Sequence, residues 1–400
     1  MKNLKVIILL LTVSIVTEKQ ALTKQQKTKS PKPISIEKDK TVFKLVNDNY
    51  VPLNKSEKQK QKTELITIFV HGTIIPYPSV SNAIKTMRGD KKSPLKHETF
   101  WHKYINNLRF QGFYQYQPID DLGLIKINLE KTKNLNIHEN ISHEITNIFS
   151  NNYKALKKDY KKYSYYTFGW CGRLDAQRRL ESAEQFYKEL IKEIEKLKTK
   201  KIVPEIQIYA HSHGGNVALN LANIEKKQNK NLKIKKLVLF GTPVQKETSD
   251  CIGSNVFEKI YSFYSKGDDV QVADFISTKK HKSNRKFYTK EKPLPNKLVQ
   301  VEVKCDKLKP RHSELWITKT RANLMYRDRL CISPYPVLIF EPSITNQIEN
   351  NFKDCNNIKV NIRKTKKPNS FDVSIKDFQK KHLDKKHYTI NIPANNLNKV

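Results

Sequence analysis

The feature that most constrains this chain is the segment 206–221, IQIYAHSHGGNVALNL. It begins with alternating apolar residues, the pattern of a short buried strand, and ends in small and apolar residues typical of a helix. Between them lies 210–214, AHSHG, a G-x-S-x-G pattern with alanine in its first position. The segment therefore predicts a strand, a sharp turn that carries Ser212, and a helix.

The small residues of this segment are those that such a turn requires. The chain must reverse within about two residues, which leaves the serine in a strained backbone conformation. Side chains two positions before and after it would collide with the neighbouring strand and the new helix, so Ala210 and Gly214 fit, and Gly215 adds clearance. We expect the Ser212 hydroxyl to stand at the helix N-terminus, with the His213 backbone N–H as an oxyanion donor.

The N-terminal region has the composition of an export signal followed by a tether. Residues 1–22 contain Lys2 and Lys5 and then an apolar core, which predicts an exported protein: periplasmic, secreted or membrane-associated. The core is short for a bilayer span, and an uncleaved anchor or a buried strand are the alternatives. Residues 23–62, rich in Lys, Gln, Thr and Ser, predict a flexible tether with outer strands at 41–46 and 50–53.

A second buried-strand pattern, LITIFV at 65–70, ends in His71-Gly72-Thr73. The glycine lets the backbone come close to a substrate carbonyl, so the N–H of Thr73 or Ile74 is the candidate second oxyanion donor. We expect His71 to act as a hydrogen-bonding scaffold for this turn. The alternative is an ordinary β-turn after a core strand.

The segment 75–162 is long and polar, and we expect it to be a cap insertion over a pocket. Its aromatic residues either line an acyl-binding groove or form the cap's own core; they are Phe100, Trp101, Tyr104, Phe110, Phe113, Tyr114 and Tyr116. Strand patterns at 163–170 and 234–240 and a helical pattern at 174–198 surround the serine turn. This alternation predicts a mostly parallel sheet flanked by helices.

Two further strand patterns are each followed by polar residues. The strand at 260–264 precedes Gly267-Asp268-Asp269, and the strand at 298–303 precedes a loop with His312. From 333 to 400 the chain shows short alternating runs at 337–340, 358–362, 371–375 and 388–392. These runs predict a small antiparallel β-rich appendage that follows a main domain of residues 63–332.

The order Ser212, Asp268, His312, each just past a predicted strand, resembles the α/β-hydrolase superfamily, and within it the lipase- and esterase-like serine hydrolases. The resemblance covers residues 65–316. The motifs that carry it are HGT at 71–73, AHSHGG at 210–215, LFGTP at 239–243, GDDV at 267–270 and RHSEL at 311–315. It implies an α/β-hydrolase fold.

The resemblance also implies roles for individual residues. Ser212 would be the nucleophile, His312 the general base and acid, and Asp268 the carboxylate that orients the imidazole. Asp269 is the rival for the acid, and Asp274 is a third candidate. His211 and His213 flank the serine and are expected to pack or to line the pocket rim.

The function that we expect is hydrolysis of carboxylic esters, in particular lipid or acyl esters, through an acyl-enzyme. An acyltransferase or a peptidase with the same triad, and a non-catalytic binding protein on this fold, are the alternatives. No cofactor or metal is implied, because the five cysteines form no C-x-x-C pair and the histidines show no ligand pattern.

The formal net charge of +36 comes from lysines spread over the 400 residues. A solvated basic surface explains it, and the alternative is peripheral contact with an anionic membrane surface. We predict no nucleic-acid partner, because no dense Arg/Lys stripe with interleaved aromatics occurs. The sequence does not indicate an oligomeric state.

Overall fold

The structure, a computed structural model, describes residues 62–73, 122–131, 137–156, 160, 162–273, 283–288, 293–319, 331–332, 337–368, 370–378 and 386–391. All of them belong to one unit, Lys62–Val400. The predicted export signal, the predicted tether up to residue 61, the seven aromatics of the predicted cap, Ile74 and Asp274 lie outside these residues.

A ten-stranded sheet with the order β12-β11-β10-β7-β6-β5-β4-β1-β3-β2 forms the centre of the fold. Neighbours from β3 to β10 in this order run parallel, and β2, β11 and β12 are antiparallel at the edges. The strands are β1 (Lys62–Val70), β2 (Gly123–Ile127), β3 (Lys162–Gly169), β4 (Ile202–His211), β5 (Lys236–Phe240), β6 (Ile260–Tyr264), β7 (Leu298–Cys305), β10 (Asn357–Lys364), β11 (Ser370–Asp377) and β12 (Lys386–Asn391). A separate pair joins β8 (Thr318–Lys319) to β9 (Cys331–Ile332). The predicted mostly parallel sheet is confirmed.

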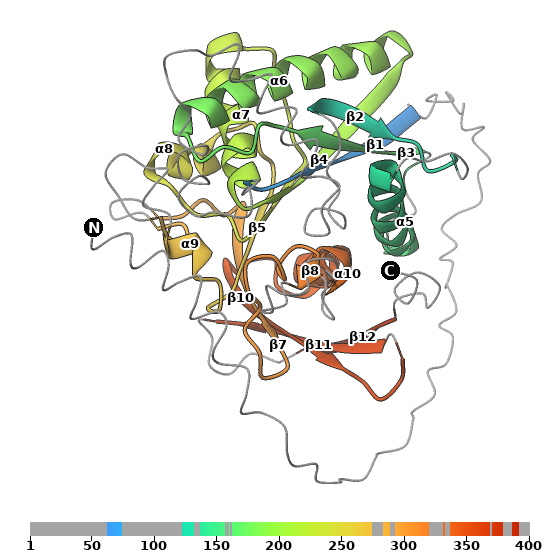
Figure 1. Cartoon of the computed structure of the whole chain (residues 1–400), viewed down its shortest axis with the longest axis vertical. Coiled ribbons are helices and arrows are strands. Elements are labelled where there is room, and N and C mark those ends of the chain that lie inside the picture. Colours follow the sequence, from blue (N-terminus) through green and yellow to red (C-terminus); the bar gives the residue numbers. More distant parts are fainter. Residues whose placement is uncertain are drawn as a thin grey trace, which may run out of the picture. The chain divides into compact units, whose positions relative to one another are not determined.

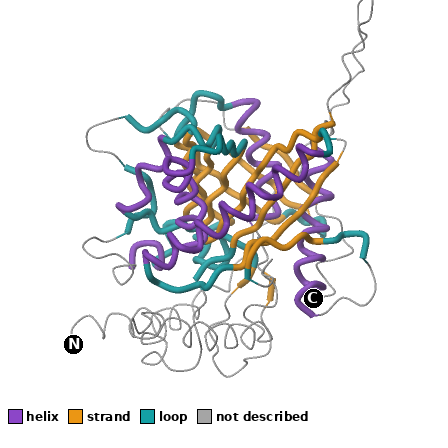
Figure 2. Tube along the Cα trace, turned by 90° about the horizontal axis from the view of Figure 1, so that it is seen from above, coloured by secondary structure: helices purple, strands orange, loops and turns teal. Residues whose placement is uncertain are grey.

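Helices cover both faces of this sheet (Figures 1 and 2). Helices α6 (Ala176–Thr199) and α7 (His213–Gln228) lie on one face, and α5 (Ile137–Leu156) and α10 (Val337–Asn351) on the other. Strand β4 shows why, since Ile208 and Ala210 pack with α6 and α7 while Tyr209, between them, packs with α5 and α10. The short helices are α8 (Lys246–Ser249), η1 (Asp250–Gly253) and α9 (Val270–Ala273).

Among the described helices, none has the length and apolar character needed to cross a membrane.

Two described elements of the predicted cap insertion at 75–162, strand β2 and helix α5, belong to the core. Strand β2 pairs antiparallel with β3 and extends the sheet, with Ile125 opposite Thr167. Helix α5 buries Ile148 and Phe149 among core residues. The last part of the predicted cap therefore belongs to the main fold, because its apolar residues are buried against the sheet rather than over a pocket.

The C-terminal region also differs from the prediction. Residues 337–340, predicted as a strand, begin helix α10, which buries Phe340, Ile344 and Ile348 at helical spacing. Strands β10, β11 and β12 are present, but β10 pairs in parallel with β7, with Val360 opposite Val303. Strands β10, β11 and β12 therefore continue the main sheet rather than form an appendage set apart from it.

Candidate active site

Ser212 lies between the end of β4 and the start of α7, in the predicted strand–turn–helix arrangement. Its φ of 52° and ψ of −131° are a conformation that non-glycine residues rarely adopt. Its backbone N–H donates to the Phe240 carbonyl at 2.8 Å, which ties the turn to the end of β5. The side chain is therefore held at the N-terminus of a 16-residue helix.

The two glycines after Ser212 allow α7 to begin close to neighbouring strands. A Cβ atom on Gly214 would lie 2.2 Å from the carbonyl oxygen of His71, and one on Gly215 would lie 2.0 Å from Oγ1 of Thr242. Both distances are far below van der Waals contact. The clearance predicted from the sequence is therefore a requirement of this packing.

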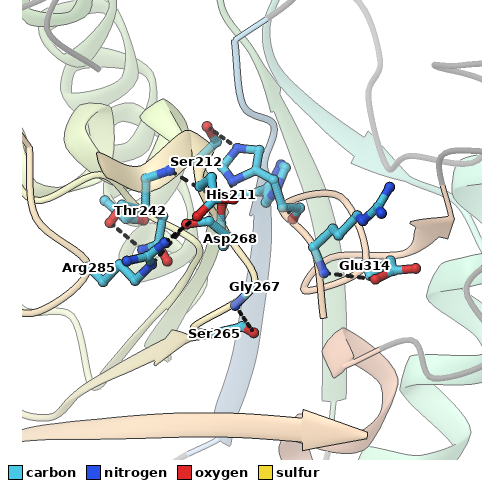
Figure 3. Close-up of polar contacts among 12 residues, drawn as sticks. His211, Ser212, Thr242, Ser265, Gly267, Asp268, Arg285 and Glu314 are labelled. Atoms are coloured by element: carbon cyan, nitrogen blue, oxygen red, sulfur yellow. Dashed lines mark hydrogen bonds and ion pairs between the residues drawn. The ribbon is translucent and has the colours of Figure 1, made fainter. Parts of the chain in front are cut away.

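His312 connects Ser212 to Asp268. Its Nε2 lies 2.7 Å from Oγ of Ser212, and its Nδ1 lies 2.8 Å from Oδ2 of Asp268. Because a carboxylate accepts, Nδ1 carries the proton and Nε2 accepts from the Ser212 hydroxyl. Figure 3 shows Ser212, His211 and Asp268 gathered at this point. The structure thus brings together the three predicted residues from loops that follow three different strands.

The carboxylate of Asp268 is completely buried and held at both oxygens. Its Oδ1 accepts from the backbone N–H of Gln271 at 3.2 Å, which leaves Oδ2 directed at His312. The side chain of Asp269 is 68% exposed and instead forms an ion pair with Arg285 at 2.7 Å. Arg285 also donates from Nε to the Asp268 carbonyl at 2.9 Å, so it holds the acid loop from outside.

His71 anchors the second turn beside the serine. Its Nε2 accepts from the backbone N–H of Trp170 at 3.1 Å, so Nδ1 carries the proton and donates to the Gly72 carbonyl at 2.7 Å. The Trp170 indole donates to the His71 carbonyl at 2.7 Å, and the two rings stack. A Cβ on Gly72 would lie 2.7 Å from Cβ of Ser212. These contacts agree with the scaffold role expected for His71.

Of the predicted oxyanion donors, His213 directly follows Ser212, and Thr73 directly follows Gly72, the residue in close contact with Ser212. His213 is the first residue of α7 and is 3% exposed. Thr73 follows the His71-Gly72 turn, and its Oγ1 is buried without a hydrogen-bond partner among the described residues. Ile74, the other candidate, lies outside the described residues.

Three contributors were missed by sequence reasoning: Trp170, Gln271 and Arg285. Gln271 had a local signal, because an aspartate three residues before a helical N–H is a typical cap. Trp170 and Arg285 had no local sequence signal, since the residues to which they donate lie 99 and 17 positions away in the chain.

The fold and the placement of Ser212 define a protein of the α/β-hydrolase class. In agreement, residues 131–300 match the model of the family described as PGAP1-like alpha/beta domain. This part of the chain is therefore a PGAP1-like α/β domain, a member of the α/β-hydrolase superfamily, as the sequence resemblance predicted. The match includes Ser212 and Asp268 and ends before His312. A search of curated proteins found no match. The family supports a hydrolase-type function in general.

Proposed function

We propose that this protein is a serine hydrolase that cleaves carboxylic esters, and lipid or acyl esters in particular, through an acyl-enzyme. The observation that carries the proposal is the continuous hydrogen-bonded chain from the buried Asp268 through His312 to Ser212, with contacts of 2.8 and 2.7 Å. A serine hydroxyl is a weak nucleophile by itself, and a base within hydrogen-bond reach is what activates it. The preference for lipid or acyl esters rests on the resemblance to lipases and esterases.

In the acylation step, Oγ of Ser212 attacks the ester carbonyl carbon while its proton passes to Nε2 of His312. The carboxylate of Asp268 stabilises the imidazolium that forms. Negative charge on the carbonyl oxygen would be met by the His213 N–H at the start of α7, with the N–H of Thr73 or Ile74 as second donor. The imidazolium then gives its proton to the leaving alkoxide, which departs as the alcohol and leaves the acyl group on Ser212.

Deacylation repeats these steps with water. His312 takes a proton from the water as its oxygen attacks the acyl carbonyl, and the proton returns to Oγ of Ser212 as the acid leaves. An alcohol or amine in place of water would give acyl transfer by the same route. We also propose, on the N-terminal sequence alone, that the protein is exported.

The test combines a fluorophosphonate probe with p-nitrophenyl esters of increasing chain length. We expect the probe to label Ser212, and we expect Ser212→Ala and His312→Ala each to lower ester turnover by about 10³–10⁶-fold. His387→Ala, at an exposed position in β12, is the control and should keep full activity. Full activity in the Ser212 or His312 variant would refute the triad, and absence of labelling would favour a non-catalytic binding protein.

A further inference from the structure

An exposed aromatic ring surrounded by lysines lies at the end of strand β11. Phe378 directly follows this strand and is 51% exposed. The ammonium groups of Lys266, Lys286 and Lys359 lie 6.0, 5.9 and 5.9 Å from the centre of its ring. These lysines come from three separate segments of the chain, so the fold itself assembles the cluster.

Lys304 and Lys376 extend this cluster. Burial lowers the pKa of Lys359, and Glu302 opposes that shift. The ammonium groups of Lys304, Lys376 and Lys266 lower the pKa of Lys359 further. Glu302, 1% exposed, is the acid at the base of the cluster and pairs with Lys266 at 3.4 Å and Lys359 at 3.9 Å. We call Phe378 together with Lys266, Lys286, Lys304, Lys359 and Lys376 the basic patch.

The register of the sheet explains why these side chains share one face. Glu302 in β7, Lys359 in β10 and Lys376 in β11 are direct partners across neighbouring strands, so they point to the same side. The adjacent residues Val360 and Ile375 point to the other side, into the core that contains α10. The basic patch therefore lies on the face of the C-terminal strands opposite α10.

The basic patch adjoins the loops of the candidate active site. Lys266 directly precedes Gly267 and Asp268, and a Cβ on Gly267 would lie 2.4 Å from the Lys309 carbonyl. The loop that leads to His312 is therefore packed against the loop that carries Asp268. Exposed apolar residues flank both loops, with Val270 51% exposed and Leu308 63% exposed.

We infer that the basic patch docks the protein on the surface of an anionic phospholipid bilayer. Five ammonium groups against one buried carboxylate complement lipid phosphates and acidic head groups. A nucleic acid or an acidic protein would satisfy the same charges, but an exposed phenylalanine among the lysines, with an exposed valine and an exposed leucine beside the adjoining loops, favours an interface with an apolar layer beneath the charges. Long lysine side chains can remain at phosphate level while Phe378 enters among the head groups. The inference rests on the proposed function in one respect, because docking here would bring the loops that carry Asp268 and His312 to the surface where a lipid ester lies.

The test is flotation of the full chain with phosphatidylcholine vesicles and with vesicles that also contain phosphatidylserine. We expect binding that depends on phosphatidylserine and falls with added salt. The double variant Lys286→Gln/Lys376→Gln should weaken it by about five-fold for each lysine, and Phe378→Ser by roughly ten-fold. Lys266 and Lys359 are left in place, since their removal would leave Glu302 buried without its cations.

Two control variants and one control ligand, duplex RNA, make the outcomes decisive. Lys188→Gln/Lys192→Gln on α6 removes the same charge at exposed positions elsewhere and should bind as the wild type does. Ser212→Ala should also bind normally, so loss of catalysis and loss of docking are separable. Equal binding by the patch and α6 variants would overturn the inference. A second combination of results would also overturn it: Phe378→Ser binds vesicles as the wild type does, while the lysine variant loses affinity for both vesicles and duplex RNA. The patch would then be a general polyanion site.

Discussion

The imidazole of His211 donates from Nε2 to the backbone carbonyl of His312, at 3.1 Å. The His211 ring also stacks on the indole of Trp316, with ring centroids 5.5 Å apart. Burial lowers the pKa of His211 well below its ordinary value, and the neighbouring His312 lowers it further, so the ring is neutral. His211 thus fixes the backbone of the proposed catalytic base, and we assign it as a positioning residue.

The first prediction concerns this donor. His211→Phe keeps an aromatic ring for stacking and loses the hydrogen bond, so the His312 backbone is less firmly placed. We expect kcat for a soluble ester to fall by about ten- to a hundred-fold with little change in KM. His211→Gln retains a donor and should recover part of the loss. If kcat and the rate of fluorophosphonate labelling were unchanged in His211→Phe, the positioning role would be wrong.

The second prediction concerns the pH dependence of stability. His211 is neutral in the folded protein and titrates near 6.5 when unfolded, so below that pH the unfolded chain binds one more proton. The contribution of His211 to the free energy of unfolding is therefore fully present above about pH 6.5. It is lost as the pH falls, by at most about 1.4 kcal/mol per pH unit. Urea unfolding at several pH values should show a shallower acid dependence in His211→Phe. An identical slope in both proteins would contradict the assignment of a neutral buried ring.

The third prediction separates the two neighbouring acids. Asp268→Asn removes the acceptor that keeps the proton on Nδ1 of His312, and we expect kcat to fall by about 10⁴-fold. Asp269→Asn is the matched control. It breaks only a partly exposed ion pair with Arg285, so activity should stay within a few-fold of the wild type. The test is the kcat of ester hydrolysis by the two purified variants. A larger loss in Asp269→Asn than in Asp268→Asn would assign Asp269 as the acid of the triad.

The core of the candidate site could be predicted because its signals are local. The segment around Ser212 carries its own strand, turn and helix patterns, and Asp268 and His312 each follow a strand whose neighbours run parallel to it. The carboxyl ends of parallel strands meet at one edge of a sheet, so three distant residues were expected to converge there. The choice of Asp268 over Asp269 needed only the family's acid-loop pattern.

The errors arose where long-range packing overrides the local pattern. The run VLIF at 337–340 fits a strand as well as a helix, and Pro342, five residues into α10, is a residue type that disfavours a helix interior. Packing against the sheet favours the helix, since the ring centroids of Phe340 and of Phe371 in β11 lie 4.8 Å apart. In the same way, β2 is a five-residue strand with mixed burial, and only its pairing with β3 makes it part of the sheet.

The fourth prediction tests the contact between α7 and β1. Replacing glycine by alanine inside a helix normally stabilises it by up to about 1 kcal/mol. Gly214→Ala should instead lower the free energy of unfolding by about 1–3 kcal/mol, because the new methyl meets the His71 and Val70 carbonyl oxygens. Gly253→Ala is the control, since a Cβ added there would meet no atom of the described residues within 4 Å apart from its own chain neighbours. Urea unfolding measures both, and a stabilised Gly214→Ala would show that the turn is looser than described.

The fifth prediction tests how α10 is joined to the sheet. Glu341 on this helix is completely buried and pairs with Lys236 of β5, whose side chain is 11% exposed, at 3.2 Å. The Lys236 ammonium also lies over the rings of Tyr153 and Tyr209. Glu341→Ala would leave this cation buried without its counter-ion, and we expect the free energy of unfolding to fall by about 3–5 kcal/mol.

The comparison variants follow from the same argument. Glu181→Ala breaks a partly exposed pair with Arg178 on α6 and should cost about 0.2–1 kcal/mol. The double variant Lys236→Met/Glu341→Gln removes both buried charges and should regain most of the loss, because the penalty lies in the unpaired charge. Chemical unfolding of the three proteins gives the ranking. Should Glu341→Ala cost no more than Glu181→Ala, the C-terminal helix would be a loosely attached element after all, closer to the separate appendage that the sequence predicted.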